Sequence, residues 1–262
     1  VAMIGSDAGY FAGRIPFDLA KELFPDPDLL SAGVATPSGT AERVAGGFRV
    51  KGRWAFASCC RHAAWFKGLC IVTENGQPVM GPGGRPQTRT VVLPMNEVEV
   101  VDNWFVTGLS GSSSNDIAVH DVFVPERRAV GDAMSGAEAV EPPGPLYVYW
   151  MMLMCNVAGV PMGIARRAID EVCALANGKV AYGTQNLIRD DLLLQMRIGR
   201  AETAWHAARA FIIETVDELW QTLLRGDALS LELKSRFRQC NLHGFHVALE
   251  VTQSMYALGG ST

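Results

Sequence analysis

The 262-residue sequence lacks any run of basic residues, and its 27 acidic side chains outnumber its 23 basic ones, for a net charge of −4. A protein of this sign without a basic patch repels a phosphate backbone, so we expect no nucleic-acid partner. Charge is scarce overall, at 19%, whereas 48% of the residues are hydrophobic. This composition predicts a folded chain with a sizeable core.

Four common motifs are also missing. The sequence has no G-x-G-x-x-G after a strand, no G-x-x-x-x-G-K-[ST], no H-E-x-x-H and no G-x-S-x-G. Rossmann, P-loop, zincin and α/β-hydrolase sites therefore have no support. Of the five histidines, His243 and His246 alone are spaced to share a helix face, and two ligands do not complete a zinc site. We predict core or interface histidines and no metal.

The six cysteines contain no C-x-x-C spacing. Adjacent Cys59 and Cys60 cannot bridge to each other without strain, and most of the six have apolar neighbours, as buried thiols do. This pattern predicts a reducing, cytoplasmic setting. A reactive thiol at Cys59, beside the cationic Arg61, is the alternative.

No charge occurs between residues 142 and 165, a stretch that superficially resembles a membrane span. Its strongly apolar part is nearer ten residues than twenty and is followed by Asn156, Gly159 and Pro161. We predict a buried helix and no membrane association. The opening Val1-Ala2-Met3 has no signal-peptide character, and we expect residues to be missing at both ends.

The hydrophobic pattern divides the chain into segregated regions. Residues 1–30 are predicted as helix and loop, 31–130 as a β domain, 131–145 as a linker and 146–262 as helical. Segregation of this kind predicts an α+β fold rather than alternating βαβ units.

Alternation supports the β region. The even-numbered positions include the apolar residues Phe48, Val50, Trp54 and Phe56. The odd-numbered positions between them include the basic residues Arg49, Lys51 and Arg53. This pattern predicts a strand with one buried face. The apolar parity changes at His120-Asp121, where we expect a bulge.

Helical spacing supports the last region. An apolar stripe with spacings of 4, 4, 3 and 4 comprises Ala208, Ile212, Val216, Leu219 and Leu223. It predicts an amphipathic helix that ends at Gly226. A second helix is expected from about 228 to 258.

Two segments carry a family resemblance. The first is G-G-F-R-V-K-G-R-W-A-F-A-S at 46–58, preceded by P-S-G-T-A at 37–41. The second is D-N-W-F-V-T-G-L-S-G-S-S-S-N-D at 102–116, which leads into D-V-F-V-P at 121–125. In this order they resemble the acyl-CoA dehydrogenase superfamily. The resemblance is closer to its flavin-dependent monooxygenase branch, the oxygenase components of two-component hydroxylases such as those acting on 4-hydroxyphenylacetate.

The resemblance covers nearly the whole chain and implies an acyl-CoA dehydrogenase-like fold. A central β-barrel or sandwich domain would occupy 31–130, and a C-terminal helical bundle would occupy 146–262. Residues 1–30 would be the remnant of an N-terminal helical domain that is mostly absent. The resemblance also implies a homotetramer built through the helical bundle.

It further implies a flavin site at the end of the first segment. A flavin ring needs a flat apolar wall, which Trp54 or Phe56 is expected to supply. Backbone groups of Ala57 and the hydroxyl of Ser58 are expected to bond the flavin edge, with Ser58 donating near N5. For Trp54 and Phe56 the alternative is plain sheet core.

Three further positions are implied. The turn that holds Ser112 and Ser113 is expected to bind a phosphate or substrate group through backbone N–H donors, with an ordinary loop as the alternative. Lys179 lies where dehydrogenases often have an arginine near the flavin pyrophosphate of a neighbouring subunit. Gly259-Gly260 matches a turn that approaches the same cofactor, and a simple helix cap is its alternative.

The sequence departs from the branch at three positions that bear on the cofactor pocket. Cys59 follows the strand where related monooxygenases usually have Gly. Ser110 stands where they often have Arg or Lys, and Ser113 where they often have Gly.

An acyl-CoA dehydrogenase is the first alternative function. It needs a glutamate base, but residues 142–165 contain no carboxylate and the other family position lies beyond Thr262. T-P-S-G-T-A at 36–41 also replaces the dehydrogenase turn T-E-P-x-A-G-S-D. We therefore favour a monooxygenase that hydroxylates an aromatic or polycyclic small molecule with O₂ and reduced FMN or FAD from a separate flavin reductase. A non-catalytic scaffold of the same fold is the second alternative.

Overall fold

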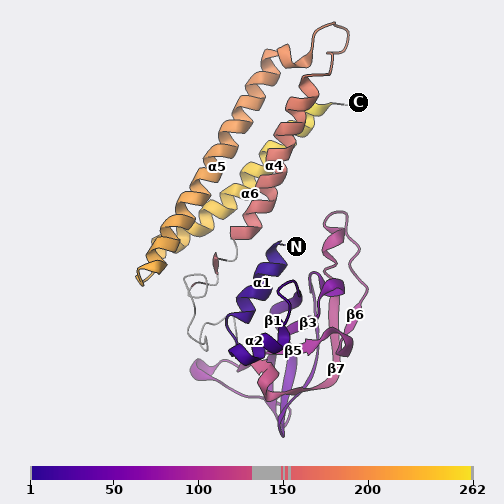
Figure 1. The fold of residues 1–262 in the computed structure, drawn as a ribbon, viewed down its shortest axis with the longest axis vertical. Coiled ribbons are helices and arrows are strands. Elements are labelled where there is room, and N and C mark those ends of the chain that lie inside the picture. Colours follow the sequence, from indigo (N-terminus) through magenta and orange to yellow (C-terminus); the bar gives the residue numbers. More distant parts are fainter. Residues whose placement is uncertain (1, 132–148, 150, 153–154, 261–262) are drawn as a thin grey trace. The chain divides into compact units, whose positions relative to one another are not determined.

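The computed structural model describes residues 2–131, 149, 151–152 and 155–260. The chain forms two compact units, Val1–Trp150 and Met151–Thr262 (Figure 1). Most of the predicted linker at 131–145, and the start of the predicted helical region at 146–148, lie outside the described residues. No helix within the described ranges is long and apolar enough to cross a membrane.

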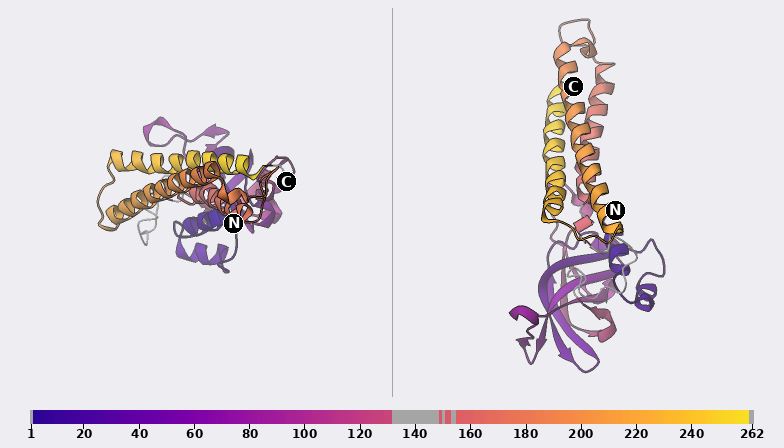
Figure 2. Two further views of the ribbon diagram at one scale, coloured as in Figure 1. Left: turned by 90° about the horizontal axis from the view of Figure 1, so that it is seen from above. Right: turned by 90° about the vertical axis from the view of Figure 1, so that its left-hand side faces the viewer.

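A mixed sheet organises the first unit (Figures 1 and 2). The strand order is β6-β7-β2-β1-β3-β5-β8, and β4 pairs with β3. β1 and β3 are parallel, whereas the other pairs are antiparallel. The strands are β1 (Ser31–Val44), β2 (Gly47–Trp54), β3 (Trp65–Glu74), β4 (Gln77–Pro78), β5 (Thr88–Pro94), β6 (Glu99–Val101), β7 (Asp116–Pro125) and β8 (Ala129–Val130).

The alternation predicted for β2 is confirmed up to Trp54. Apolar Phe48, Val50 and Trp54 are fully buried, and the three basic residues between them are exposed. Phe56 does not continue the pattern, because β2 ends at Trp54 and the backbone turns. Phe56 has φ 65° and is 69% exposed, so its prediction as part of the buried face is wrong.

The bulge predicted in β7 is also confirmed. Val50 pairs with Val122 and Gly52 pairs with Val119, so a single residue of β2 faces both His120 and Asp121. Asp121 takes the left-handed backbone, with φ 56°. The extra residue lets Val119 and Val124 both point into the core despite the change of parity.

The Trp54 side chain lies in the core of the β unit, in a socket lined by glycines of neighbouring strands. Its Nε1 donates to the Leu69 carbonyl at 2.9 Å, and its ring meets Phe66 edge-on with centroids 5.3 Å apart. A Cβ atom on Gly39 would lie 2.1 Å from the indole, and one on Gly68 would lie 3.0 Å from it. The glycine of the P-S-G-T-A segment is therefore explained by packing.

Two helices precede the sheet, α1 (Ala2–Ala12) and α2 (Phe17–Leu23). α2 begins directly after Pro16, whose fixed φ suits the start of a helix. A second apolar cluster joins this segment to β5 and comprises Phe11, Ile15, Leu19, Leu23 and Val92. A side-chain contact also joins α1 to β3, because Asp7 accepts a 2.6 Å hydrogen bond from the buried ammonium of Lys67.

Three long helices form the second unit: α4 (Cys155–Ala176), α5 (Leu192–Leu224) and α6 (Leu231–Gly259) (Figure 1). Asp191 and Ser230 cap the starts of α5 and α6 by accepting from backbone N–H groups. α5 ends just before Gly226, as predicted, and Gly226 has φ 77°. The predicted apolar stripe faces the core, although Thr215 is more deeply buried than its neighbour Val216.

Candidate functional site

The end of β2 and the loop before β7 form one site. The Ala57 N–H donates to the Asn115 carbonyl at 3.0 Å, and the Cys59 N–H donates to the Ser112 carbonyl at 2.7 Å. The Cys60 thiol donates to the Ser113 carbonyl at 3.2 Å. The two segments that carry the family resemblance therefore lie against each other.

Asn115 holds the loop together from the inside, where it is 1% exposed. Its Oδ1 accepts from the N–H groups of Asn103 and Trp104 at 3.2 and 3.1 Å, and its Nδ2 donates to Ser113 Oγ at 2.9 Å. One amide side chain thus ties the start of the loop to its end. Sequence reasoning gave Asn115 no role, although it lies within the S-N-D of the second segment.

Unusual backbone angles concentrate at this site. Six non-glycine residues in the described ranges have positive φ, and four of them lie here. They are Phe56 at 65°, Cys59 at 61°, Leu109 at 57° and Ser113 at 46°. Such conformations each cost of order 1–3 kcal/mol and cluster at functional sites. Ser113 adopts this strained angle at the position where relatives often have glycine.

Apolar side chains face outward beside these turns. Phe105 is 82% exposed and Leu109 is 78% exposed. The Phe56 ring meets the Trp104 ring edge-on at 6.1 Å between centroids, and Trp104 Nε1 donates to the Leu109 carbonyl at 3.1 Å. Phe56 is thus an oriented, accessible flat ring, which fits the wall that a flavin needs.

The other candidate wall is excluded by burial. Trp54 has 0% exposure and lies within the core cluster of the sheet. Its packing corresponds to the sheet-core alternative, and of the two rings the accessible one is Phe56. The prediction that Trp54 faces a flavin is therefore corrected.

Hydroxyl groups form a chain behind the accessible ring. Half-buried Ser58 lies 2.8 Å from Ser114, Oγ to Oγ, and Ser114 lies 2.9 Å from Ser112. The chain ends where Ser112 Oγ donates to the Leu109 carbonyl at 2.7 Å. Ser58 is thus a partly accessible polar residue close in sequence to Phe56. Ser114 is a site residue that the sequence analysis did not identify.

Several expected backbone donors are already engaged. The Ala57 N–H bonds to Asn115, so it is not available to a flavin. The N–H groups of Ser112 and Ser113 donate to the carbonyls of Leu109 and Ser110 at 3.0 and 3.2 Å. The expectation that Ser112 and Ser113 bind a phosphate through these donors is therefore corrected, because both groups hold the turn itself.

Charged groups beside the site are paired. Asp116 accepts from Arg53 Nε at 2.7 Å. Burial opposes ionisation of Asp116, but hydrogen bonds involving Asn103, Arg53 and the Phe56 backbone hold its pKa below the ordinary value. Arg61, the cation named in the reactive-thiol alternative for Cys59, pairs with Asp102 at 2.7 Å.

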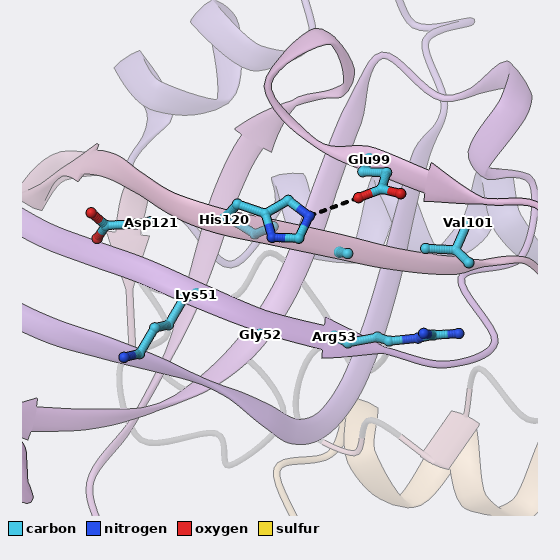
Figure 3. Close-up of a pocket in the computed structure, with 9 residues that line it drawn as sticks. Lys51, Gly52, Arg53, Glu99, Val101, His120 and Asp121 are labelled. Carbon is cyan, nitrogen blue, oxygen red and sulfur yellow. Dashed lines mark hydrogen bonds and ion pairs between the residues drawn. The ribbon is translucent and has the colours of Figure 1, made fainter.

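A cavity of about 660 Å³ lies elsewhere, beside the β7 bulge. Figure 3 shows His120 pointing to Glu99, to which its Nε2 is 2.7 Å distant, while Lys51 and Arg53 extend from β2. None of the predicted site residues lines this cavity. Its His–Glu contact and the Arg53–Asp116 pair are satisfied within the protein, so we assign it no ligand.

In the second unit, the structure brings Lys179 and the Gly259-Gly260 turn together. Lys179 Nζ donates to the Gly259 carbonyl at 3.0 Å, and a Cβ on Gly260 would lie 3.4 Å from the same ammonium. Gly260 has φ 64°. A lysine ammonium carries three donors, so two remain after the bond to Gly259.

The histidines of α6 do not lie in the core. His243 and His246 are exposed on this chain, which corrects the core prediction and leaves the interface prediction open. In the part of the chain that the structure describes, no group of three or more His, Cys, Asp or Glu residues is arranged to hold a metal ion.

Known proteins share this architecture. Residues 155–262 match the family described as acyl-CoA dehydrogenase, C-terminal domain. The whole chain is 31% identical to indole-3-acetate monooxygenase of Pseudomonas putida and spans 65% of that relative. The crystal structure of 3-HSA hydroxylase from Rhodococcus sp. RHA1 matches with a TM-score of 0.82 and 25% identity, over 99% of this chain and 67% of that one. In sequence the chain is similar to flavin-dependent monooxygenase oxygenase components, and it has the acyl-CoA dehydrogenase-like fold.

A further member of this family is the FADH(2)-dependent resorcinol hydroxylase, oxygenase component, of Rhizobium sp. (strain MTP-10005). It is 28% identical over 90% of this chain, which spans 59% of that relative. The chain therefore spans less than two thirds of the length of these two curated relatives.

Proposed function

We propose that the chain acts as the oxygenase component of a two-component hydroxylase. Its substrate would be an aromatic or polycyclic small molecule, with reduced flavin supplied by a separate reductase. The observation that carries this proposal is the accessible Phe56 ring, oriented by Trp104 and two residues before Ser58. The monooxygenase names of the relatives support it.

The residues present fit a flavin, either FMN or FAD. Bound reduced flavin supplies the two electrons that convert one atom of O₂ to water while the other enters a C–H bond of the substrate. Phe56 would form the wall for the ring, and Ser58 would bond its edge. Exposed Phe105 and Leu109 would help to exclude water from the reacting atoms.

Lys179 and Gly260 fit the phosphate end of such a cofactor. Among the described residues, the Lys179 ammonium bonds only to the Gly259 carbonyl, and its two other donors beside a glycine turn suit a phosphate or pyrophosphate group. We propose that this pair binds the cofactor of a neighbouring subunit.

We propose a homotetramer built through the helical unit. α6 exposes an apolar stripe with spacings of 3, 4 and 7, comprising Leu242, Phe245, Leu249 and Tyr256. These spacings place the four side chains on one helix face, away from the buried face that holds Val247, Val251 and Met255. Exposed apolar surface of this kind marks an interface.

We also propose a cytoplasmic location. Each of the five cysteines whose side chains the structure describes is a free thiol, which suits a reducing compartment.

The proposal is tested with the full chain, reduced FMN or FAD, a panel of phenols and indoles, and ¹⁸O₂. The expected result is binding of reduced flavin and one ¹⁸O atom in a hydroxylated product. Bleaching of bound flavin by an acyl-CoA without O₂ would favour dehydrogenation instead. A tetramer that binds flavin in neither redox state would favour a scaffold.

A further inference from the structure

The hydroxyl chain behind Phe56 has a fixed direction. A carbonyl oxygen can only accept, so the 2.7 Å contact between Ser112 Oγ and the Leu109 carbonyl uses the single proton of Ser112. Ser112 must then accept in its 2.9 Å contact with Ser114, so Ser114 is the donor there. The direction of each link follows from the one before it.

The same argument reaches Ser58. The only hydroxyl proton of Ser114 is engaged with Ser112, so in the 2.8 Å contact Ser58 donates to Ser114. Ser114 is 6% exposed, which limits exchange of this partner with water. The proton of Ser58 therefore points inward, and no other described group donates to Ser58 Oγ. Toward the outside, Ser58 presents only lone pairs.

We propose that Ser112 and Ser114 are positioning residues that make Ser58 a hydrogen-bond acceptor, so that the site selects reduced over oxidised flavin. The inference rests on the proposed function, in which Ser58 faces N5. Reduced flavin carries a hydrogen on N5 and can donate to an accepting oxygen. Oxidised N5 has only a lone pair, which repels another one. This reverses the donor role predicted for Ser58 from the sequence.

The readout is equilibrium binding of both redox forms to the full chain, with FMN and FAD each titrated aerobically and, after reduction, anaerobically. In the wild type, the Kd for oxidised flavin is expected to exceed that for reduced flavin. Ser114→Ala frees the Ser58 proton to donate outward. It should weaken binding of reduced flavin and strengthen binding of oxidised flavin, each by about fivefold, the worth of one neutral hydrogen bond.

The two Kd values should change in opposite directions if Ser114→Ala only reverses the hydrogen bond of Ser58. A loop distorted by the substitution would instead bind both forms of the flavin less well. Ser112 is half-buried, and Ser112→Ala should lower the ratio of the oxidised-flavin Kd to the reduced-flavin Kd, as Ser114→Ala does. Ser112→Thr keeps the hydroxyl and should keep the wild-type ratio. Thr107→Ala, which removes an exposed hydroxyl from the same loop, is the matched control. When the ratio of the oxidised-flavin Kd to the reduced-flavin Kd falls tenfold, the two-electron midpoint potential of the bound flavin falls by about 30 mV. This potential is a second measurement.

Two negative outcomes have different meanings. If the wild type binds flavin but Ser114→Ala leaves the ratio unchanged, or weakens both forms equally, the hydroxyl chain does not set the polarity. If the wild type binds neither form, the proposed function itself is overturned.

Discussion

Lys179 donates a 3.0 Å hydrogen bond from its ammonium to the carbonyl oxygen of Gly259, a residue 80 positions later in the chain. The loop after α4 is thereby joined to the end of α6. The bond uses one of the three N–H donors of the ammonium, so it orients the group beside Gly260 and leaves two donors for a ligand. Both positions were assigned to the cofactor from the family resemblance, and the structure makes them neighbours.

Lys179→Met is expected to weaken FAD binding by about tenfold, since a charge-assisted bond to phosphate contributes about 1.5–3 kcal/mol. Lys179→Arg should retain most of the affinity because it keeps the charge. The measurement is the Kd for FAD at two salt concentrations, with Lys21→Met as the control for loss of one lysine. Unchanged affinity in Lys179→Met would remove this residue from the cofactor site.

Substitutions at Phe56 and at Trp54 should change different properties, flavin binding in the first case and the free energy of unfolding in the second. Phe56→Ala is expected to weaken flavin binding by about tenfold, with little change in the free energy of unfolding, because its ring is largely exposed. Trp54→Ala should instead reduce that free energy by about 3–5 kcal/mol, since it empties a core socket. Denaturant unfolding and flavin titration of both variants test the assignment, and equal loss of stability in the two would contradict it.

Gly39→Ala tests the packing of this socket. The added Cβ would lie 2.1 Å from the Trp54 ring, so either the ring or β1 must move. We expect a loss of about 3 kcal/mol in the free energy of unfolding. Gly199→Ala, in α5 with open space around it, should raise stability by about 0.5–1 kcal/mol. A Gly39→Ala protein as stable as the wild type would show that the socket yields easily.

The buried Lys67–Asp7 pair predicts a stability effect that depends on pH. Burial lowers the pKa of Lys67, and the Asp7 carboxylate opposes part of this shift. The unfolded chain therefore binds this proton more readily than the native protein below the ordinary value of 10.5. As pH rises from the lowered native value toward 10.5, wild-type stability should increase relative to Lys67→Met.

Single substitutions in the pair should differ at neutral pH. Asp7→Asn leaves the Lys67 ammonium without its charged partner and should cost about 1–3 kcal/mol. Lys67→Met removes the buried charge and should be neutral or stabilising. Urea unfolding between pH 7 and 10 measures both effects. A difference between wild type and Lys67→Met that does not vary with pH would contradict the expected protonation change.

Leu249→Glu tests assembly through α6. A charge in the exposed apolar stripe should dissociate the proposed tetramer, which analytical ultracentrifugation would detect as a smaller species. Met80→Glu, an exposed apolar-to-acidic change in the other unit, should leave the assembly intact. Tetramers in Leu249→Glu would place the interface elsewhere.

Local patterns in the sequence predicted the parts of the fold that neighbouring residues determine. Alternation identified the buried face of β2, and a single parity change located the bulge at His120-Asp121. Prediction failed at Phe56, whose backbone turns where the loop before β7 bonds to the end of β2. The prediction of a flavin wall also failed at Trp54, because glycines of β1 and β3 pack against the indole.

The site could be located from the sequence, but not its hydrogen bonding. The family resemblance assigned the two segments to one site, and the structure places them in contact. The directions of the hydroxyl contacts depend on which groups meet in space, so Ser114 and Asn115 had no visible role. For the same reason, nothing in the sequence showed that the N–H groups of Ser112 and Ser113 were already used.

The cross-loop contacts also bear on how the protein folds. Ser58 meets Ser114 across 56 positions, and Cys60 meets Ser113 across 53. Between them lie β3 to β6, so each contact closes a long segment of chain, and non-local closure of this kind is slow. We therefore expect the accepting oxygen of Ser58 to form late in folding. A newly made chain should acquire its affinity for the cofactor only once the sheet is assembled, so recovery of binding during refolding would report completion of the sheet.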